Sequence, residues 1–262
     1  MSARGSIETD GAVRRIELAG VAGMPEITEG DNVGALLAAA AIGLSDDSVV
    51  VVSQKIVSKA EGRVRDLAEV EPGERARELA AQLGKDPRVV ELVLAESRRL
   101  VRAERGVLIV ETRAGWICAN AGIDASNVPG EDAVTLLPLD PDASARRLRE
   151  EIREAVGARP AVVIADSFGR PWRLGQTDVA IGCAGLIALD DWRGRRDAQG
   201  RELTATAIAI ADQLAAAADL ARDKAARVPA IVVRGCAAWV TKEDGPGAAA
   251  ALQRPATDDL FR

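Results

Sequence analysis

Two short stretches place carboxylates directly after apolar runs, where they could bind a metal ion or a phosphate. One is NAGIDASN, which contains Asp124 and Asn127, and the other is VVIADSFGRPWR, which contains Asp166 and Ser167. An Asp at a strand end beside a hydroxyl suits a magnesium ion that also contacts phosphate oxygens. The same residue types are common turn formers, so the sequence leaves a purely structural interpretation open.

The composition restricts which chemistry is available. The chain has no His and no Tyr, which excludes a Ser-His-Asp triad, a His general base and His-ligated zinc. Its three Cys are far apart in the sequence, so a structural zinc site or a disulfide framework is not expected. Catalysis must therefore use carboxylates, Lys, Arg, hydroxyls and ions that prefer oxygen ligands, such as magnesium, manganese or calcium.

A second group of charges follows the valine run in VVVVSQKIVSKAEGR, at residues 49–63. Lys55 and Lys59 are four positions apart and share a face, where they would either bind an anion or simply meet solvent. The chain has no G-x-x-x-x-G-K-[ST] and no G-x-G-x-x-G that leads from a strand into a helix. A nucleotide would therefore need these lysines, or Arg170 and Arg173, in place of a P-loop or a Rossmann fingerprint.

The overall composition favours a soluble enzyme of substantial size. With 262 residues, 48% hydrophobic, the chain can form one large domain or two interlocked lobes. The net charge of −6 and the low aromatic content argue against nucleic acid as a partner. We expect a cytoplasmic protein that is not bound to membrane, because the N-terminus lacks a signal-peptide core and no apolar run reaches about 20 residues.

Hydrophobic patterning predicts a mixed α/β fold, without the regular alternation of a doubly wound sheet. Strands are expected at Val13–Leu18, Ser48–Val52, Gly106–Glu111, Trp116–Cys118, Ala161–Ala165, Val179–Leu189 and Ala230–Val233. Helices are expected from Asp31 to Ala41, at Glu74–Leu83, from Pro87 to Val101, from Pro141 to Gly157 and at Thr204–Asp223. A polar loop at Asp190–Gly200 and a partly irregular tail at residues 243–262 complete the prediction.

Several motifs occur together in the order typical of one enzyme family. They are GMPEITEGDN, SQKIVSKAEGR, NAGIDASN, ADSFGRPWRLGQTDVAIGCAGL, ADQLAAAADL and the closing RPATDDLFR. With these motifs the chain resembles the coenzyme F420:L-glutamate ligases, which add glutamate to a deazaflavin coenzyme. The resemblance spans nearly the whole chain, and the Asp-Ser-Phe-Gly-Arg block is its specific part.

The resemblance implies a GTP-dependent ligase that joins L-glutamate to the carboxylate of the coenzyme F420 precursor, F420-0. An acyl phosphate would be the intermediate, and further gamma-linked glutamates would follow the first. It also implies Mg²⁺ or Mn²⁺ at a two-metal site, K⁺ as a further cation, and a homodimer. The expected architecture is a single ligase module over residues 1–262, with two interlocked lobes and neither a P-loop nor a Rossmann fold.

The family's functional residues match particular positions of this chain. The GTP contacts fall on Met24, Pro25, Glu26, Ile27, Gln54, Lys59 and Asn127. The metal ligands fall on Asp124, Asp166 and Ser167, and the catalytic set implied is Asp124, Asp166 and Lys59. Phosphoryl transfer needs positioning and neutralised charge more than covalent help from the protein, which suits this set.

Three departures from the family pattern qualify the resemblance. Ala207 replaces a Glu of some relatives in the expected long helix, and Asp223-Lys224 replaces a Gly-Lys. The chain also ends where two-domain relatives continue into a nitroreductase-like domain, which predicts a free-standing ligase. The alternatives are a nucleotide-binding homologue that has lost the chemistry, and a ligase for a different acceptor or amine.

Overall fold

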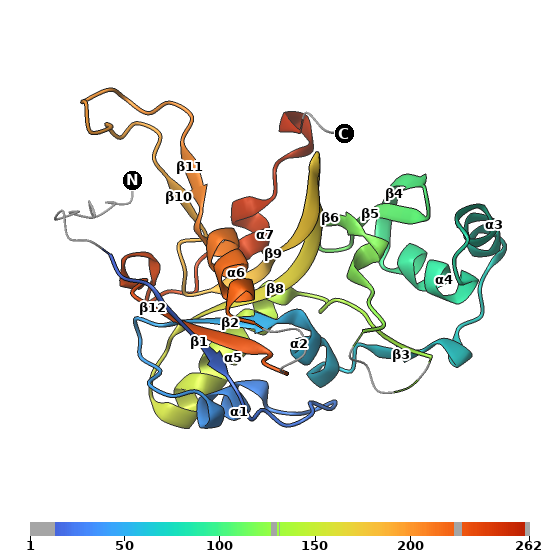
Figure 1. Ribbon diagram of the computed structural model, residues 1–262, viewed down its shortest axis with the longest axis horizontal. Coiled ribbons are helices and arrows are strands. Elements are labelled where there is room, and N and C mark those ends of the chain that lie inside the picture. Colours follow the sequence, from blue (N-terminus) through green and yellow to red (C-terminus); the bar gives the residue numbers. More distant parts are fainter. Residues whose placement is uncertain (1–13, 127–129, 131, 223–226, 260–262) are drawn as a thin grey trace.

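The computed structural model describes residues 14–126, 130, 132–222 and 227–259, and a five-stranded sheet lies at its centre (Figure 1). The strand order is β1 (Glu17–Val21), β12 (Ala230–Arg234), β2 (Val49–Ser53), β8 (Ala161–Arg170) and β9 (Arg173–Ala184). Strands β2 and β8 run parallel, and the other neighbours in this sheet are antiparallel. The mixed α/β class predicted from the sequence is confirmed.

Helices cover both faces of this sheet and explain the unbroken valine run. Val50 and Val52 pack with α1 (Val33–Ala40) and α5 (Pro141–Val156), whereas Val49 and Val51 pack with α6 (Ile210–Leu220) and α7 (Gly247–Leu252). All four valines are fully buried. A strand covered on both faces reads as a continuous apolar run, as expected from the sequence.

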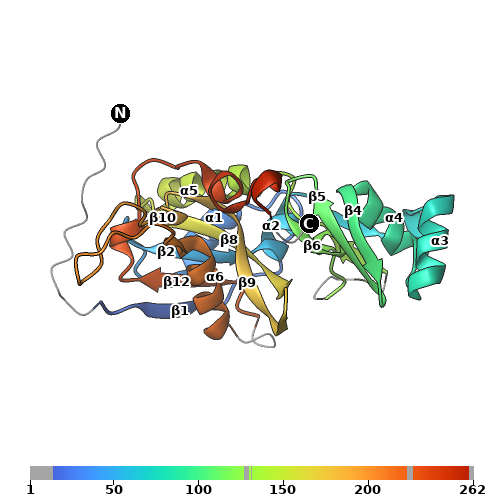
Figure 2. The same cartoon turned by 90° about the horizontal axis from the view of Figure 1, so that it is seen from above.

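A second, smaller core lies to one side of the main sheet (Figure 2). It contains α3 (Glu74–Leu83), α4 (Pro87–Ala95) and the antiparallel strands β4 (Ser97–Glu104), β5 (Val107–Thr112) and β6 (Ile117–Ala119). The antiparallel pair β3 (Val64–Asp66) and β7 (Ala133–Thr135) flanks it in the sequence. A further two-stranded arm consists of β10 (Leu189–Asp191) and β11 (Ala207–Ala209) (Figure 1).

Local signals predicted several boundaries correctly. Helix α3 ends at Gly84, whose φ of 65° is left-handed, as the sequence predicts. Helix α5 begins after Asp140, whose carboxylate accepts from the amide of Ala143 at 2.9 Å, and it ends at Gly157. Strands β5 and β6 pair as expected.

Two predicted helices are wrong in length. The helix that starts at Pro87 ends at Ala95 instead of Val101, because Ser97–Glu104 forms strand β4 against β5. The helix predicted from Thr204 begins only at Ile210. Ala207 is therefore an exposed residue of β11 and does not belong to the long helix. In both cases pairing with another strand, β5 in the first and β10 in the second, outweighs local helix propensity.

Other elements are displaced from their predicted positions. The first strand, β1, lies at Glu17–Val21, later than expected. Helix α1 is capped by Asn32, because the carboxylate of Asp31 accepts instead from the amide and hydroxyl of Thr28. Strand β8 extends beyond its predicted end into a hairpin with β9, which begins at Arg173 and ends at Ala184, short of the predicted Leu189. Strand β10 starts at Leu189 and continues into the predicted polar loop.

Up to Asp259, the tail contains α7 and a short 3₁₀ turn, η4 (Ala256–Asp258), within otherwise irregular chain. Arg149 of α5 holds the segment before α7 in place. Its fully buried guanidinium donates to the carbonyls of Pro160 at 2.9 Å and Thr241 at 2.6 Å, and to Asp244 at 2.6 Å. Arg159 also donates to Asp244, at 3.2 Å.

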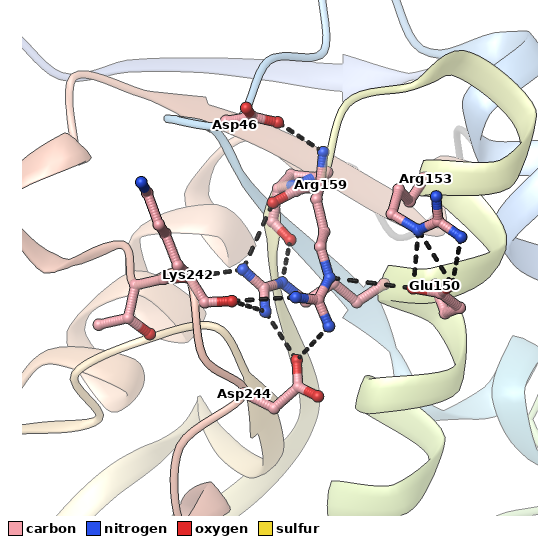
Figure 3. Close-up of polar contacts among 9 residues, drawn as sticks. Asp46, Glu150, Arg153, Arg159, Lys242 and Asp244 are labelled. Atoms are coloured by element: carbon pink, nitrogen blue, oxygen red, sulfur yellow. Dashed lines mark hydrogen bonds and ion pairs between the residues drawn. The ribbon is translucent and has the colours of Figure 1, made fainter.

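We expect Arg149→Ala to lower the free energy of unfolding by about 3–5 kcal/mol, because it removes a fully buried side chain and leaves the carbonyls of Pro160 and Thr241 without this donor. Urea unfolding followed by circular dichroism measures this loss. Arg153→Ala is the matched control: its side chain is 46% exposed and pairs with Glu150 on the surface of the same helix (Figure 3), so little change is expected. Equal losses in the two variants would contradict a structural role specific to Arg149.

In the part of the chain that the structure describes, no helix has the length and apolarity needed to cross a membrane.

Candidate metal and nucleotide site

The candidate site lies at the carboxyl end of β2, beside the part of the parallel strand β8 that continues past it. Ser53 of β2 is in register with Ala165 of β8, so Gln54 and Asp166 follow at the same edge of the sheet. Helix α2 (Gln54–Ala60) begins directly after β2 and carries the two lysines. In sheets with parallel strands, this edge commonly binds ligands.

Asp166 and Ser167 belong to an extended strand and do not form a turn. Strand β8 continues through them to Arg170, and they lie opposite Val179 and Asp178 of β9. The turn interpretation is therefore wrong for this stretch. Because side chains alternate along a strand, Asp166 and Ser167 point to opposite faces of the hairpin.

Negative charge is concentrated around Asp166. Burial, together with the charges of Asp178 and Asp124, raises the pKa of Asp166 to about 7, although the amide of Ser167 and the charge of Lys55 act in the opposite direction. Asp124, distant in sequence, thus lies near enough to Asp166 to affect its ionisation. A cation placed between these carboxylates would favour the charged form of both.

Asp124 is held in a local turn and an ion pair. Its carboxylate accepts from the amide of Ser126 at 2.7 Å, and it lies 2.8 Å from the ammonium of Lys55. Burial raises the pKa of Asp124, but the hydrogen bonds from Lys55 and Ser126 outweigh this effect, so the pKa is lower than usual. Here the turn interpretation of the sequence is confirmed. Asn127 lies outside the described residues.

The backbone that leads to Asp124 is strained. Asn120 and Ala121 have φ values of 51° and 54°, which are uncommon for residues other than Gly. Together with Gly122 they form the 3₁₀ turn η2 (Asn120–Gly122), directly after β6. Such strain is frequent at functional sites.

The MPEI segment, which carries four of the expected nucleotide contacts, lies against α2. Glu26 forms an ion pair with Lys59, whose exposed fraction is only 8%. Ile27 is buried in the main core, Met24 packs against that core, and Pro25 is exposed. The structure therefore brings these residues and Lys59 together.

Gln54 is buried at the start of α2. Its carbonyl oxygen accepts from the hydroxyl of Ser58 at 2.7 Å, whereas its amide nitrogen has no partner among the described residues. A buried donor without a partner is costly, so this nitrogen is available for a ligand oxygen. The position assigned by resemblance to a GTP contact thus has an unused donor.

Three residues that the sequence did not assign also belong to the site. Lys55 pairs with Asp124, as described above, and Cys118 lies near Asp166, whose charge adds to burial in raising the pKa of the thiol to about 12. Asp178 is 1% exposed and accepts from the hydroxyl of Ser167 at 2.6 Å. A lone Asp at the start of the apolar run VAIGCAG is the one sequence signal that points to Asp178.

The donor set fits a hard divalent ion. Within the described ranges, no group of three or more His, Cys, Asp or Glu side chains that could hold a metal ion is present. Asp124 and Asp166 offer two carboxylates to one ion, and Ser167 offers its hydroxyl to a second ion from the opposite face of the hairpin. Mg²⁺ characteristically combines one or two carboxylates with water and substrate phosphates. The raised pKa of Asp166 indicates excess negative charge that such an ion would neutralise.

Fold and site together define a mixed α/β enzyme whose carboxylates and lysines meet at one edge of a sheet. The family model described as F420-0:Gamma-glutamyl ligase matches residues 22–235, and the chain belongs to this family. The resemblance seen in the sequence is confirmed.

Curated relatives cover nearly the whole chain. It is 42% identical over 252 residues to the coenzyme F420:L-glutamate ligase of Methanothermobacter thermautotrophicus, covering 94% of this chain and 99% of the relative. It is 44% identical over 238 residues to that of Methanopyrus kandleri, covering 90% and 94% respectively. The ligase of Haloarcula marismortui is 47% identical over 226 residues, covering 84% and 87%.

Proposed function

We propose that this protein is a GTP-dependent ligase that joins L-glutamate to the carboxylate of the coenzyme F420 precursor F420-0. Further gamma-linked glutamates are then added by the same reaction. The observation that carries the proposal is the convergence of Asp166, Asp124 and Lys55 beside the carboxyl end of β2, in a chain of this family.

The reaction divides into two balanced steps. A carboxylate oxygen of the acceptor attacks the terminal phosphorus of GTP, and GDP leaves, which gives an acyl phosphate. The amine of glutamate then attacks the acyl carbon, loses a proton and expels phosphate, so that an amide forms. The attacking carboxylate is already ionised, so the first step needs no general base and the absence of His is no obstacle.

The residues of the chain act by binding and orientation. We assign Lys59 to the phosphates of GTP, because it is a nearly buried cation beside the MPEI segment. The free amide donor of Gln54 is assigned to a nucleotide oxygen. Met24, Pro25, Glu26, Ile27 and Asn127 complete the assigned nucleotide contacts.

We assign Asp124, Asp166 and Ser167 as ligands of Mg²⁺ or Mn²⁺, in a site that accommodates two ions when nucleotide is bound, with K⁺ as a further cation. When bound, such ions neutralise the charge that develops on the phosphates. Asp166 and Asp124 supply negative charge from two different segments, so the site depends on correct packing of β6 and β8, which are in contact.

We also propose that residues 1–262 act as one module with two interlocked lobes, as a homodimer and in the cytoplasm. The second core around α3 and β4–β6 supports the two lobes. Size-exclusion chromatography with light scattering measures the oligomeric state.

Purified protein supplied with GTP, Mg²⁺ or Mn²⁺, L-glutamate and F420-0 is expected to yield products heavier by one or more glutamyl units. Mass spectrometry measures the mass shift, and phosphate release must match it in amount. Omission of glutamate is the control that separates ligation from simple GTP hydrolysis. If an active relative gives product in parallel and this protein gives none, the proposal fails; tight GTP binding without phosphate release would favour a non-catalytic homologue instead.

A further inference from the structure

Ser167, Asp178 and Arg222 form a chain of contacts behind the candidate metal site. The hydroxyl of Ser167 donates to one carboxylate oxygen of Asp178 at 2.6 Å, and Arg222 donates to the other at 2.7 Å. Asp178 is 1% exposed and the side chain of Arg222 is 13% exposed. Both oxygens of Asp178 are therefore occupied by fixed partners.

The buried ion pair between Asp178 and Arg222 is not explained by a gain in stability. Two nitrogens of the Arg222 guanidinium, Nε and one of the terminal pair, are buried without a partner among the described residues. Burying an ion pair rarely stabilises a fold relative to apolar residues, and unpaired buried donors add to the cost.

The direction of the hydrogen bond between Ser167 and Asp178 suggests what the Asp178–Arg222 ion pair does. A hydroxyl has one hydrogen and two lone pairs, and Asp178 takes the hydrogen. The lone pairs of Ser167 are then left for a cation, and rotation about the Cβ–Oγ bond is restricted. Partners outside the direct ligands commonly orient a metal ligand in this way.

We propose that Asp178 and Arg222 are positioning residues, which hold the Ser167 hydroxyl in the orientation that binds the divalent metal. Arg222 fixes the carboxylate of Asp178, and Asp178 fixes the hydroxyl. This inference rests on the proposed function, since it assigns a role toward the metal of that site.

The test measures Mn²⁺ affinity by electron paramagnetic resonance, in the presence of a non-hydrolysable GTP analogue. We expect Asp178→Asn to weaken Mn²⁺ binding about 10- to 100-fold, as is usual when such a partner is removed. Arg222→Gln should act in the same direction, whereas Arg222→Lys, which keeps the charge, should retain most of the affinity. The Arg222 variants remain informative if Asp178→Asn fails to fold.

A double-mutant cycle separates orientation from simple charge. If Asp178 acts through Ser167, then adding Asp178→Asn to Ser167→Ala should cause almost no further loss of Mn²⁺ affinity. An equally large loss in both backgrounds would mean that Asp178 contributes only its charge, and would overturn the proposal. Wild-type affinity in Asp178→Asn would overturn it as well.

Asp190→Asn is the matched control. Asp190 is also a buried Asp, and it pairs with Arg195 at 2.9 Å in the separate β10–β11 arm. Its replacement should leave Mn²⁺ affinity unchanged. Absence of Mn²⁺ binding in the wild type would refute the metal site of the proposed function itself, whereas binding that is insensitive to Asp178 and Arg222 refutes only this inference.

Discussion

Asp166→Asn is expected to lower glutamylation turnover about a thousandfold or more while the fold is retained. The amide has the shape of the carboxylate but lacks its charge, so the site loses a central anionic ligand for the metal. Steady-state kinetics at saturating GTP and Mn²⁺ measure turnover, and circular dichroism checks the fold. Turnover equal to that of the wild type would make Asp166 a purely structural strand residue.

The same variant should gain stability relative to the wild type when metal is absent and the pH is high. The folded protein raises the pKa of Asp166 to about 7, through burial and the charges of Asp178 and Asp124, from an unfolded value of 3.8. The folded state therefore binds this proton more tightly than the unfolded state. The stability contributed by protonated Asp166 is complete below about pH 4 and is lost as the pH rises to about 7.

The amide introduced by Asp166→Asn does not titrate, so the stability of the variant does not fall over this pH range for this reason. Urea unfolding in EDTA should show that the free energy of unfolding of the variant increases relative to that of the wild type as the pH rises from about 5 to about 8. Added Mn²⁺ should stabilise the wild type at the upper end of this range and the variant much less, because only the wild type retains the full ligand set. An advantage that does not change with pH would contradict the electrostatic cause.

The sequence predicted those parts of the fold that depend on neighbours along the chain. The valine run of β2 and the Asp140 cap of α5 are local signals, and both appear where expected. The first part of strand β4, residues 97–101, was predicted as helix, because its extended state depends on pairing with β5, which helix propensity does not reveal. Pairing between strands was thus the main source of error in the predicted helices.

In the candidate site too, the sequence revealed the residues that have a local signal but not the contacts between segments. Asp166 and Ser167 were found because they follow an apolar run, although the strand continues through them. Arg222 could not be found, because it meets Asp178 from 44 residues away. Lys55 and Lys59 lie four positions apart on α2, yet they pair with Asp124 and Glu26, which come from different segments.

The two lysines have different partners, so their replacement should have different consequences, and the replacement of Lys59 is the second change with a large expected effect. Lys59→Met should lower kcat/KM for GTP about 100-fold, because it removes the nearly buried cation assigned to the phosphates. Lys59→Arg keeps the charge and should lose less. Lys55→Met is the matched control: Lys55 faces Asp124, so its loss should change Mn²⁺ affinity more than KM for GTP.

Stability should hardly change in Lys59→Met, which makes the kinetic result interpretable. Glu26, the partner of Lys59, is 58% exposed, and ion pairs with such a partner contribute about 1 kcal/mol or less. Burying the ammonium of Lys59 removes part of its hydration, and the ion pair with Glu26 adds little stability in return. Binding of a ligand would therefore explain why a lysine is buried here. If Lys59→Met instead unfolded at much lower urea while the remaining folded fraction kept normal kcat/KM for GTP, Lys59 would be a structural residue, and the nucleotide phosphates would need another cation.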